Sequence, residues 1–336
     1  MGKIQFTNIK SKKYVSITTE VKGGMNRGNC LTITESGLLI IGGEYGGSTG
    51  AYDLKTGERL FYDEIGQQEG ICAYGDNLFL GAYPKAQIYL MKTDVSFSSH
   101  TSLLNMGSAP SVSGYHHQDR PYNFLSIYEK GLVAVATIPA QGYTTGAIAL
   151  LDGETGATKY HAKFPVEHQS AASLAYSDGK LFMGTTVQAG SGTSSRANQA
   201  LLVSMDIETK ETKTYKLPFN VRGILTMCTD NDGKIWGMAW NHFFCFDPET
   251  EEFVYTKQVD LNCNNGGWKD VKMSLGGDGK CLFVSSIITK DFFRFDMETG
   301  DFDMIAEDIG CYHVGDDEGN FYFVDGVNVN KLVFEY

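Results

Sequence analysis

The sequence predicts an all-β fold, a seven-bladed β-propeller of four-stranded antiparallel blades. Two repeats predict it. A tight polar turn between two short apolar strands occurs seven times in the 336 residues, at spacings of 40 to 54 residues (Gly37 to Asn77, then Asn77 to Gly131). A second turn, Asp-x-x-Thr followed by Gly or another polar residue, occurs five times. The first set of turns is Glu35–Gly37, Asp76–Asn77, Glu129–Gly131, Ser177–Gly179, Asn231–Gly233, Gly277–Gly279 and Asp317–Gly319; the second set is Asp53–Gly57, Asp152–Gly156, Asp206–Lys210, Asp247–Glu251 and Asp296–Gly300.

The second repeat predicts the hairpin between the two outer strands of a blade. Alternating apolar strands such as 243–246 and 292–295 precede it, and another strand follows each copy. An Asp side chain accepts hydrogen bonds from the backbone of its own turn, and Gly adopts the positive φ that such turns need. One small sheet cannot bury its faces alone, so we expect the repeats to stack into a closed ring.

We expect a single domain over residues 1–336, in which each repeat contributes one blade. Six blades are predicted with four strands each, whereas the segment 309–336 has three at most. The strand-like segments 2–8 and 13–20 are therefore expected to close the last blade, which leaves no exposed sheet edge. The predicted blades cover 28–66, 67–105, 119–166, 167–219, 220–260, 267–308 and 309–336.

Composition narrows the class of partner. The chain has 28 basic and 40 acidic residues, a net charge of −12, and its basic residues are not clustered. We therefore expect it to bind neither nucleic acid nor an anionic membrane. Seven cysteines without a Cys-x-x-Cys pair fit buried, reduced thiols. This predicts a cytoplasmic location for the sequence as written, and a secreted or periplasmic one if a leader has been removed.

Ligand-binding residues are expected on one face of the ring. In a propeller, the loops that lead into each blade and the loops between its second and third strands surround the same mouth of the central channel. Two long polar loops, 106–118 and 187–199, also interrupt the repeat, and such loops often carry function. Basic and aromatic residues gather on this face of an acidic protein, which favours an anionic small ligand such as an acidic oligosaccharide, or a protein partner. The predicted binding residues are Arg27, Glu69, Tyr83, His117, Arg120, Tyr122, Gln169, Arg196, Trp240, Trp268, Lys269 and Tyr312.

A catalytic role would need a base together with a group that neutralises a substrate carboxylate. We predict His168, His313, Tyr143 and Arg222 for these roles. The structural alternative is that arginines on this face only pair with neighbouring carboxylates such as Glu69.

Metal binding has weak support in the sequence. There is no His-x-x-x-His pair and no Asp-rich calcium loop, so spacing predicts no metal set. Ring folds do gather ligands that are distant in sequence, and one hypothesis places a divalent metal on the axis, with Glu69, Asn29 and Asp270 as its candidate ligands. P-loop, dinucleotide and nucleophile-elbow motifs do not occur.

Seven stretches of the chain carry a family resemblance. They are Gly81–Pro84, Gln118–Pro121, Thr137–Tyr143, Gly146–Ala149, Val166–Ser170, Gly184–Gly190 and Asp247–Thr250. In order and content they resemble a broad group of bacterial seven-bladed propellers described as YncE-like, WD40-like or quinoprotein-like. The resemblance covers most of the chain and implies the propeller fold, which hosts many functions. More distantly, the residue types at the mouth resemble those of propeller-fold polysaccharide lyases, in which His, Tyr and Arg act on uronic-acid glycans.

Three functions follow as hypotheses. The first is a carbohydrate-active enzyme, a lyase in preference to a hydrolase, which acts on an acidic oligosaccharide at the axial mouth. The second is a non-catalytic propeller that binds a ligand or a protein partner through the same face. The third is a hydrolase or lactonase with an axial metal, as in gluconolactonase-like propellers. Each hypothesis predicts a different observation. The lyase should form an unsaturated product that absorbs in the ultraviolet, and the binding propeller should be stabilised by its ligand without turnover. The metal-dependent hydrolase should contain stoichiometric metal.

Overall fold

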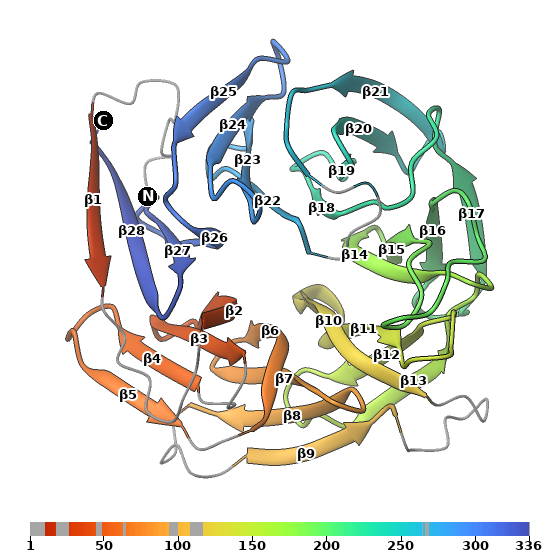
Figure 1. Ribbon diagram of the computed structural model, residues 1–336, viewed down its shortest axis with the longest axis horizontal. Coiled ribbons are helices and arrows are strands. Elements are labelled where there is room, and N and C mark those ends of the chain that lie inside the picture. The colour runs from red at the N-terminus through yellow and green to blue at the C-terminus, as the bar shows by residue number, and fades with distance from the viewer. Residues whose placement is uncertain are drawn as a thin grey trace.

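The computed structural model describes residues 11–17, 27–44, 49–62, 65–93, 100–107, 117–263, 265 and 269–335. The described strands form seven antiparallel sheets of four strands each, arranged around a central axis (Figure 1). The predicted fold class is confirmed: the chain is an all-β, seven-bladed propeller. Within the described part of the chain, no helix is long and apolar enough to span a membrane.

In the first six sheets the chain runs from the strand nearest the axis to the outermost strand (Figure 1). The first three sheets contain β2 (Arg27–Ile33), β3 (Leu38–Glu44), β4 (Thr49–Asp53) and β5 (Arg59–Tyr62); β6 (Gln67–Tyr74), β7 (Asn77–Tyr83), β8 (Gln87–Lys92) and β9 (His100–Asn105); and β10 (Gln118–Ile127), β11 (Leu132–Pro139), β12 (Ala147–Asp152) and β13 (Thr158–Lys163). The next three contain β14 (Ser170–Ser177), β15 (Lys180–Thr186), β16 (Leu201–Asp206) and β17 (Thr212–Lys216); β18 (Thr226–Thr229), β19 (Ile235–Ala239), β20 (His242–Asp247) and β21 (Glu252–Gln258); and β22 (Val271–Leu275), β23 (Cys281–Ser286), β24 (Phe292–Asp296) and β25 (Phe302–Ala306).

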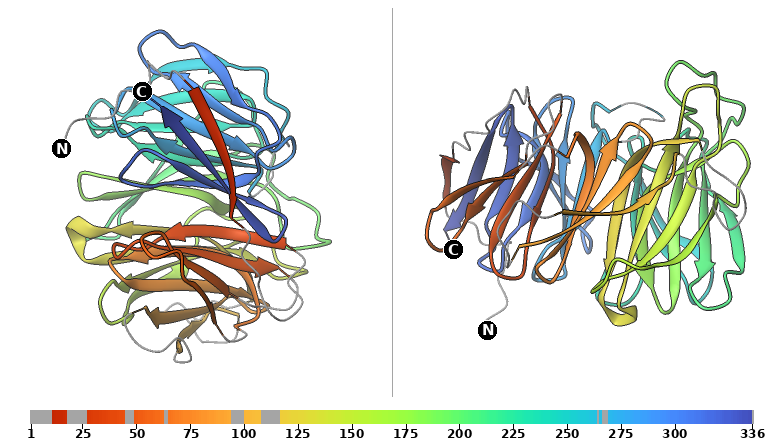
Figure 2. Two further views of the ribbon diagram at one scale, coloured as in Figure 1. Left: turned by 90° about the vertical axis from the view of Figure 1, so that its left-hand side faces the viewer. Right: turned by 90° about the horizontal axis from the view of Figure 1, so that it is seen from below.

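The seventh sheet joins the two ends of the described chain. Its order is β1-β28-β27-β26, with β26 (Cys311–Gly315) nearest the axis, followed by β27 (Phe321–Asp325), β28 (Asn328–Glu335) and β1 (Ser11–Ile17). In Figure 1, and in the left view of Figure 2 where it is red, β1 lies beside the blue strand β28, to which it is antiparallel.

The repeated Asp turns adopt the predicted hairpin geometry. In each of the five, the Asp carboxylate accepts hydrogen bonds from the backbone N–H groups two and three residues later; for Asp53 the distances are 2.8 and 3.0 Å. The residue four positions after the Asp has positive φ whether it is Gly57 (76°) or, in two copies without glycine, Lys210 (65°) and Glu251 (57°). These backbone donors lower the pKa of Asp152 to about 2, with further help from Lys159.

Hydrophobic side chains fill the interfaces between neighbouring sheets. Among the described residues there are seven buried clusters, and each combines side chains from two adjacent blades. Phe243 of the fifth sheet stacks on Phe295 of the sixth, with ring centroids 4.3 Å apart. Leu39 of the first sheet belongs to one cluster with Tyr322 of the seventh. Each blade is therefore covered on both faces, and the ring leaves a channel along its axis.

Candidate functional site

The central channel is the candidate site, because all seven innermost strands contribute to its wall. It encloses a cavity of about 600 Å³. The innermost strands run in the same direction along the axis, so their N-terminal ends gather at one opening. We call this opening the mouth and define it by five lining residues, Asn29, Glu69, Tyr122, Lys269 and Tyr312.

Irregularities in the innermost strands place four of these five side chains. The pairing register between the first and second strands shifts between Gly28 and Cys30, between Gln68 and Gly70, between Arg120 and Asn123, and between Cys311 and Val314. Asn29, Glu69, Tyr122 and Tyr312 lie within these shifts. A β-bulge adds an unpaired residue and redirects its side chain, and bulges are common at the rims of barrel-like folds. Tyr312 has φ of 55°, a left-handed conformation that is uncommon for a bulky residue.

Glu69 is the buried carboxylate of the mouth, with 1% of its surface exposed. It accepts hydrogen bonds from Asn29 Nδ2 at 3.1 Å and from Gln67 Nε2 at 2.7 Å, and it forms an ion pair with Arg120. The Arg120 guanidinium also lies over the ring of Tyr83, 4.2 Å from its centroid. The negative charge of Glu69 is therefore neutralised inside the protein.

Lys269 is the cation that faces the channel at the mouth. Its Nζ donates to the carbonyl oxygen of Asn29 at 3.2 Å and lies 4.6 Å from the ring centroid of Tyr122 and 5.3 Å from that of Tyr312. Burial lowers the pKa of Lys269, and the nearby charge of Glu69 opposes this effect. Burial also raises the pKa of both tyrosines, so their phenols are neutral at physiological pH.

Arg27, another cation on this side of the ring, already has a partner. Arg27 is exposed but forms an ion pair with Glu44, which raises the pKa of the guanidinium. Among the described residues, Lys269 forms no ion pair. The mouth thus contains the carboxylate of Glu69, which is paired with Arg120, and the ammonium group of Lys269, which contacts a carbonyl oxygen and two aromatic faces.

Of the four predicted catalytic residues, His313 is the one within the channel wall. It is 2% exposed, its Nε2 is 2.7 Å from Ser274 Oγ, and its Nδ1 is 2.8 Å from Ser285 Oγ. Burial, followed by the charge of Lys272, lowers the pKa of His313 to about 3. At neutral pH this side chain is an uncharged part of the packing between the sixth and seventh blades, with both ring nitrogens hydrogen-bonded.

The other three predicted catalytic residues form contacts of their own, separate from those of His313. His168 Nδ1 lies 2.9 Å from Thr144 Oγ1. Tyr143, 39% exposed, stacks on His117 with ring centroids 4.1 Å apart. Arg222 is exposed and donates to Ser195 in the long loop 187–199.

The remaining predicted binding residues divide by exposure. Gln169 is buried, and its Nε2 donates to the carbonyl of Gln199 at 3.1 Å, so it connects segments of its own blade. Trp240 Nε1 donates to the carbonyl of Cys263 at 3.0 Å. Arg196 is exposed in the loop 187–199. Trp268 and residues 108–116 of the first long loop lie outside the described residues.

The mouth does not fit a metal site of the kind the sequence suggested. Both carboxylate oxygens of Glu69 accept hydrogen bonds from N–H donors, one of them from the proposed co-ligand Asn29. Within the described ranges, no group of three or more His, Cys, Asp or Glu side chains is arranged to hold a metal ion.

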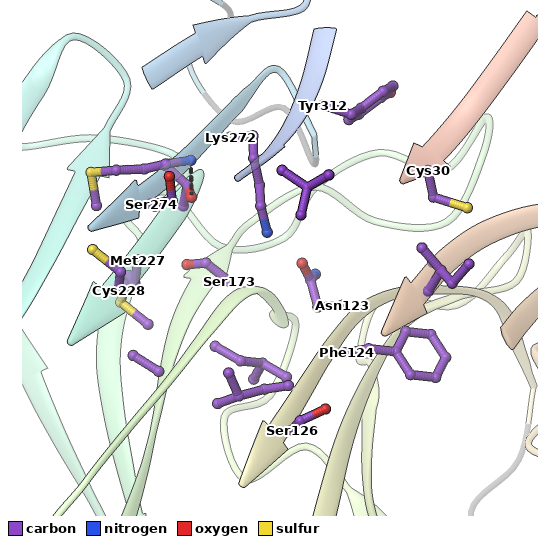
Figure 3. Close-up of a pocket in the computed structure, with 18 of the residues that line it drawn as sticks. Cys30, Asn123, Phe124, Ser126, Ser173, Met227, Cys228, Lys272, Ser274 and Tyr312 are labelled. Carbon is purple, nitrogen blue, oxygen red and sulfur yellow. Dashed lines mark hydrogen bonds between the residues drawn. The ribbon is translucent and has the colours of Figure 1, made fainter. Parts of the chain in front are cut away.

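The interior of the channel contains residues that sequence analysis did not single out. Lys272 extends from β22 toward the centre of the channel, and Asn123 and Ser173 lie on facing strands (Figure 3). The signal was present in the segment Val271-Lys272-Met273, where buried apolar residues flank a charged one. In an innermost strand, that alternation sends the charged side chain into the channel.

Comparison with known proteins supports the fold at low sequence identity. No protein-family model matches the chain, and no curated protein matches it. Among solved structures, it is similar to a streptogramin B lyase (12% identity, TM-score 0.68, 96% of this chain and 98% of that chain). A catalytically inactive virginiamycin B lyase from Staphylococcus aureus with quinupristin is equally similar (12%, TM-score 0.68, 96% and 99%). The WD40 domain of Toxoplasma gondii coronin also matches (11%, TM-score 0.64, 99% and 88%). These similarities define the class, a seven-bladed propeller with WD40-like neighbours.

Proposed function

We propose that this protein is a ligand-binding propeller that holds a small carboxylate-bearing molecule at the mouth of its channel. The observation that carries the proposal is Lys269. Its ammonium group lies at the opening of the cavity and has no carboxylate partner among the described residues, whereas Arg27 and Arg120 are each paired.

Lys269 is a cation that has lost part of its hydration. Burial disfavours the charged form of Lys269, and an anion placed beside it would restore that form. Charge-assisted hydrogen bonds of this kind are stronger than neutral ones. The cavity of about 600 Å³ is also within the range of small-molecule sites. A cation covers one face of three aromatic rings at this end of the channel, those of Tyr83, Tyr122 and Tyr312. We therefore propose that these rings stabilise the cations rather than stack on sugars.

A second candidate is the lyase on acidic oligosaccharides that the sequence suggested. One observation favours it: Lys269 has a lowered pKa and lies beside two tyrosines, so its neutral amine could take a proton next to a bound carboxylate. The streptogramin lyases with the same fold indicate that this architecture can host elimination chemistry. Their substrates are not carbohydrates, so the uronic-acid substrate depends on the sequence argument alone.

The test is a thermal-shift screen and titration with simple carboxylates and with uronic-acid oligosaccharides. We expect carboxylates to raise the Tm. Lys269→Gln should remove the shift, whereas Lys92→Gln, which makes the same charge change at an exposed position on β8, should retain it. An ultraviolet band from an unsaturated uronate product would instead establish the lyase. If no carboxylate stabilises the protein, the anion-binding proposal is wrong, and a protein-binding scaffold becomes the better hypothesis.

A further inference from the structure

The channel contains a second lysine, deeper than Lys269, that forms no ion pair with the part of the chain that the structure describes. Lys272 lies on β22 and its side chain points into the channel, as Figure 3 shows. Its ammonium group makes no hydrogen bond or ion pair with any described residue. The wall near it includes Asn123 and Ser173, whose side chains already donate to the carbonyl groups of Ala171 and Ile224.

Among the described residues, no group near Lys272 carries a negative charge that could neutralise it at physiological pH. The described carboxylates that line the cavity are Glu69, which is paired with Arg120, and Glu129, which follows the far end of β10 and accepts a hydrogen bond from Tyr176. The nearby thiols of Cys72 and Cys228 have pKa values raised to about 12 by burial, so they are protonated. His313 is neutral for the reason given above.

Burial lowers the pKa of Lys272 as it does that of Lys269. The side chain of Lys272 is nevertheless exposed to the channel, so its position in the channel wall and its lack of a carboxylate partner among the described residues are what favour an anion beside it. An anionic group of a ligand would supply the missing charge. Lys272 thus repeats inside the channel the electrostatic situation found at the mouth.

The spacing of the two lysines sets the shape of the ligand. Three residues of extended chain span at most about 11 Å, so the two backbone positions are separated by no more than that along the wall. Apolar side chains, including Leu31, Ile71 and Leu174, line the same cavity. A molecule with two anionic ends and an apolar middle matches this distribution of charge and apolar surface.

We propose that the ligand is a linear dicarboxylate, with one carboxylate bound by Lys269 at the mouth and the other by Lys272 inside the channel. This inference rests on the proposed function, because it requires the first carboxylate to bind at the mouth. It adds the class of ligand and a second anion subsite.

The experiment is a calorimetric titration at constant ionic strength with the linear dicarboxylates from succinate to sebacate, each compared with the monocarboxylate of the same chain length. One dicarboxylate of the series should bind at least about tenfold more tightly than its monocarboxylate, which corresponds to about 1.4 kcal/mol. Lys272→Met should remove this gain and leave monocarboxylate binding unchanged. Lys92→Gln is the control that should alter neither.

The outcomes separate the two proposals. If Lys272→Met leaves the gain for dicarboxylates intact, the inner subsite is wrong while the mouth site stands. If Lys269→Gln leaves monocarboxylate binding unchanged, the mouth site fails, and the two-lysine arrangement fails with it. Equal affinities for every dicarboxylate and its monocarboxylate in the unaltered protein would also overturn the inference. Lys272→Gln repeats the test with a polar side chain, so the result does not depend on how one variant folds.

Discussion

His313 makes the stability of this protein sensitive to acid. Its two ring nitrogens contact Ser274 and Ser285, and its pKa falls from 6.5 to about 3 because it is buried and faces the charge of Lys272. On unfolding, the imidazole returns to water and regains its ordinary pKa. Between about pH 6.5 and pH 3 the unfolded chain therefore binds one proton that the folded chain does not, and the folded state loses stability as the pH falls through this range.

The size of this loss follows from the two pKa values. Each pH unit within the window costs about 1.4 kcal/mol of unfolding free energy for one such group. Lowering the pH from about 7 to about 4.5 should therefore remove about 2.5 kcal/mol through His313 alone. Above about pH 7.5 its contribution is complete and no longer changes with pH.

The measurement compares urea unfolding of the unaltered protein and of His313→Gln at several pH values. Glutamine keeps polar atoms near the two serines but does not titrate, and the carboxylates elsewhere contribute equally to both proteins. The unaltered protein should thus lose about 2.5 kcal/mol more than the variant over this range. Parallel pH profiles, or an imidazole resonance of His313 that titrates near 6.5 in the folded protein, would refute the reasoning.

Two further predictions concern the mouth and the packing within a blade. Arg120→Met should lower the free energy of unfolding by roughly 3–5 kcal/mol, because it leaves the buried carboxylate of Glu69 unpaired. In urea unfolding, adding Glu69→Gln to this variant should recover part of the loss. A double variant no more stable than Arg120→Met would contradict this. Gly237→Ala should lower the free energy of unfolding by roughly 1–3 kcal/mol, because the added methyl group would lie 2.1 Å from the buried ring of Phe244. Gly315→Ala, whose added methyl group would have its nearest contact at 3.4 Å, is the control in thermal unfolding. Equal Tm values for the two variants would argue against this explanation by packing.

The fold could be predicted because its information is local and repeated. Each Asp turn requires only a carboxylate, its own backbone and a residue with positive φ, and these lie within five consecutive positions. Even the copies without glycine, at Lys210 and Glu251, adopt the same conformation. The alternation of exposed and half-buried side chains along Glu252–Gln258 likewise follows from the local sequence without reference to distant residues.

The site was less predictable because its contacts join distant segments. Sequence analysis placed Glu69, Arg120 and Lys269 on one face of the ring, but it could not decide which cation pairs with which carboxylate. The pairing joins different blades: Arg120 of the third blade reaches Glu69 of the second, and Lys269, which precedes β22 of the sixth blade, reaches the backbone of Asn29 in the first. His313 shows the opposite case, because a residue expected at the mouth is held between two serines of the sixth blade.

The deeper reason lies in how the innermost strands meet the channel. In a regular strand, successive side chains alternate between two faces, so residues 269 and 272 would point in opposite directions. Both line the same cavity because β22 begins only at Val271, and Lys269 precedes the alternating segment. The bulges at Asn29, Glu69, Tyr122 and Tyr312 have a similar effect, since one additional residue changes which face the following side chains occupy. Alternation therefore predicts the channel lining within a strand, as at Lys272, but not at the mouth, where five of the seven innermost strands depart from it. The mouth is thus the part of this propeller in which chemistry can vary while the repeated blades stay the same.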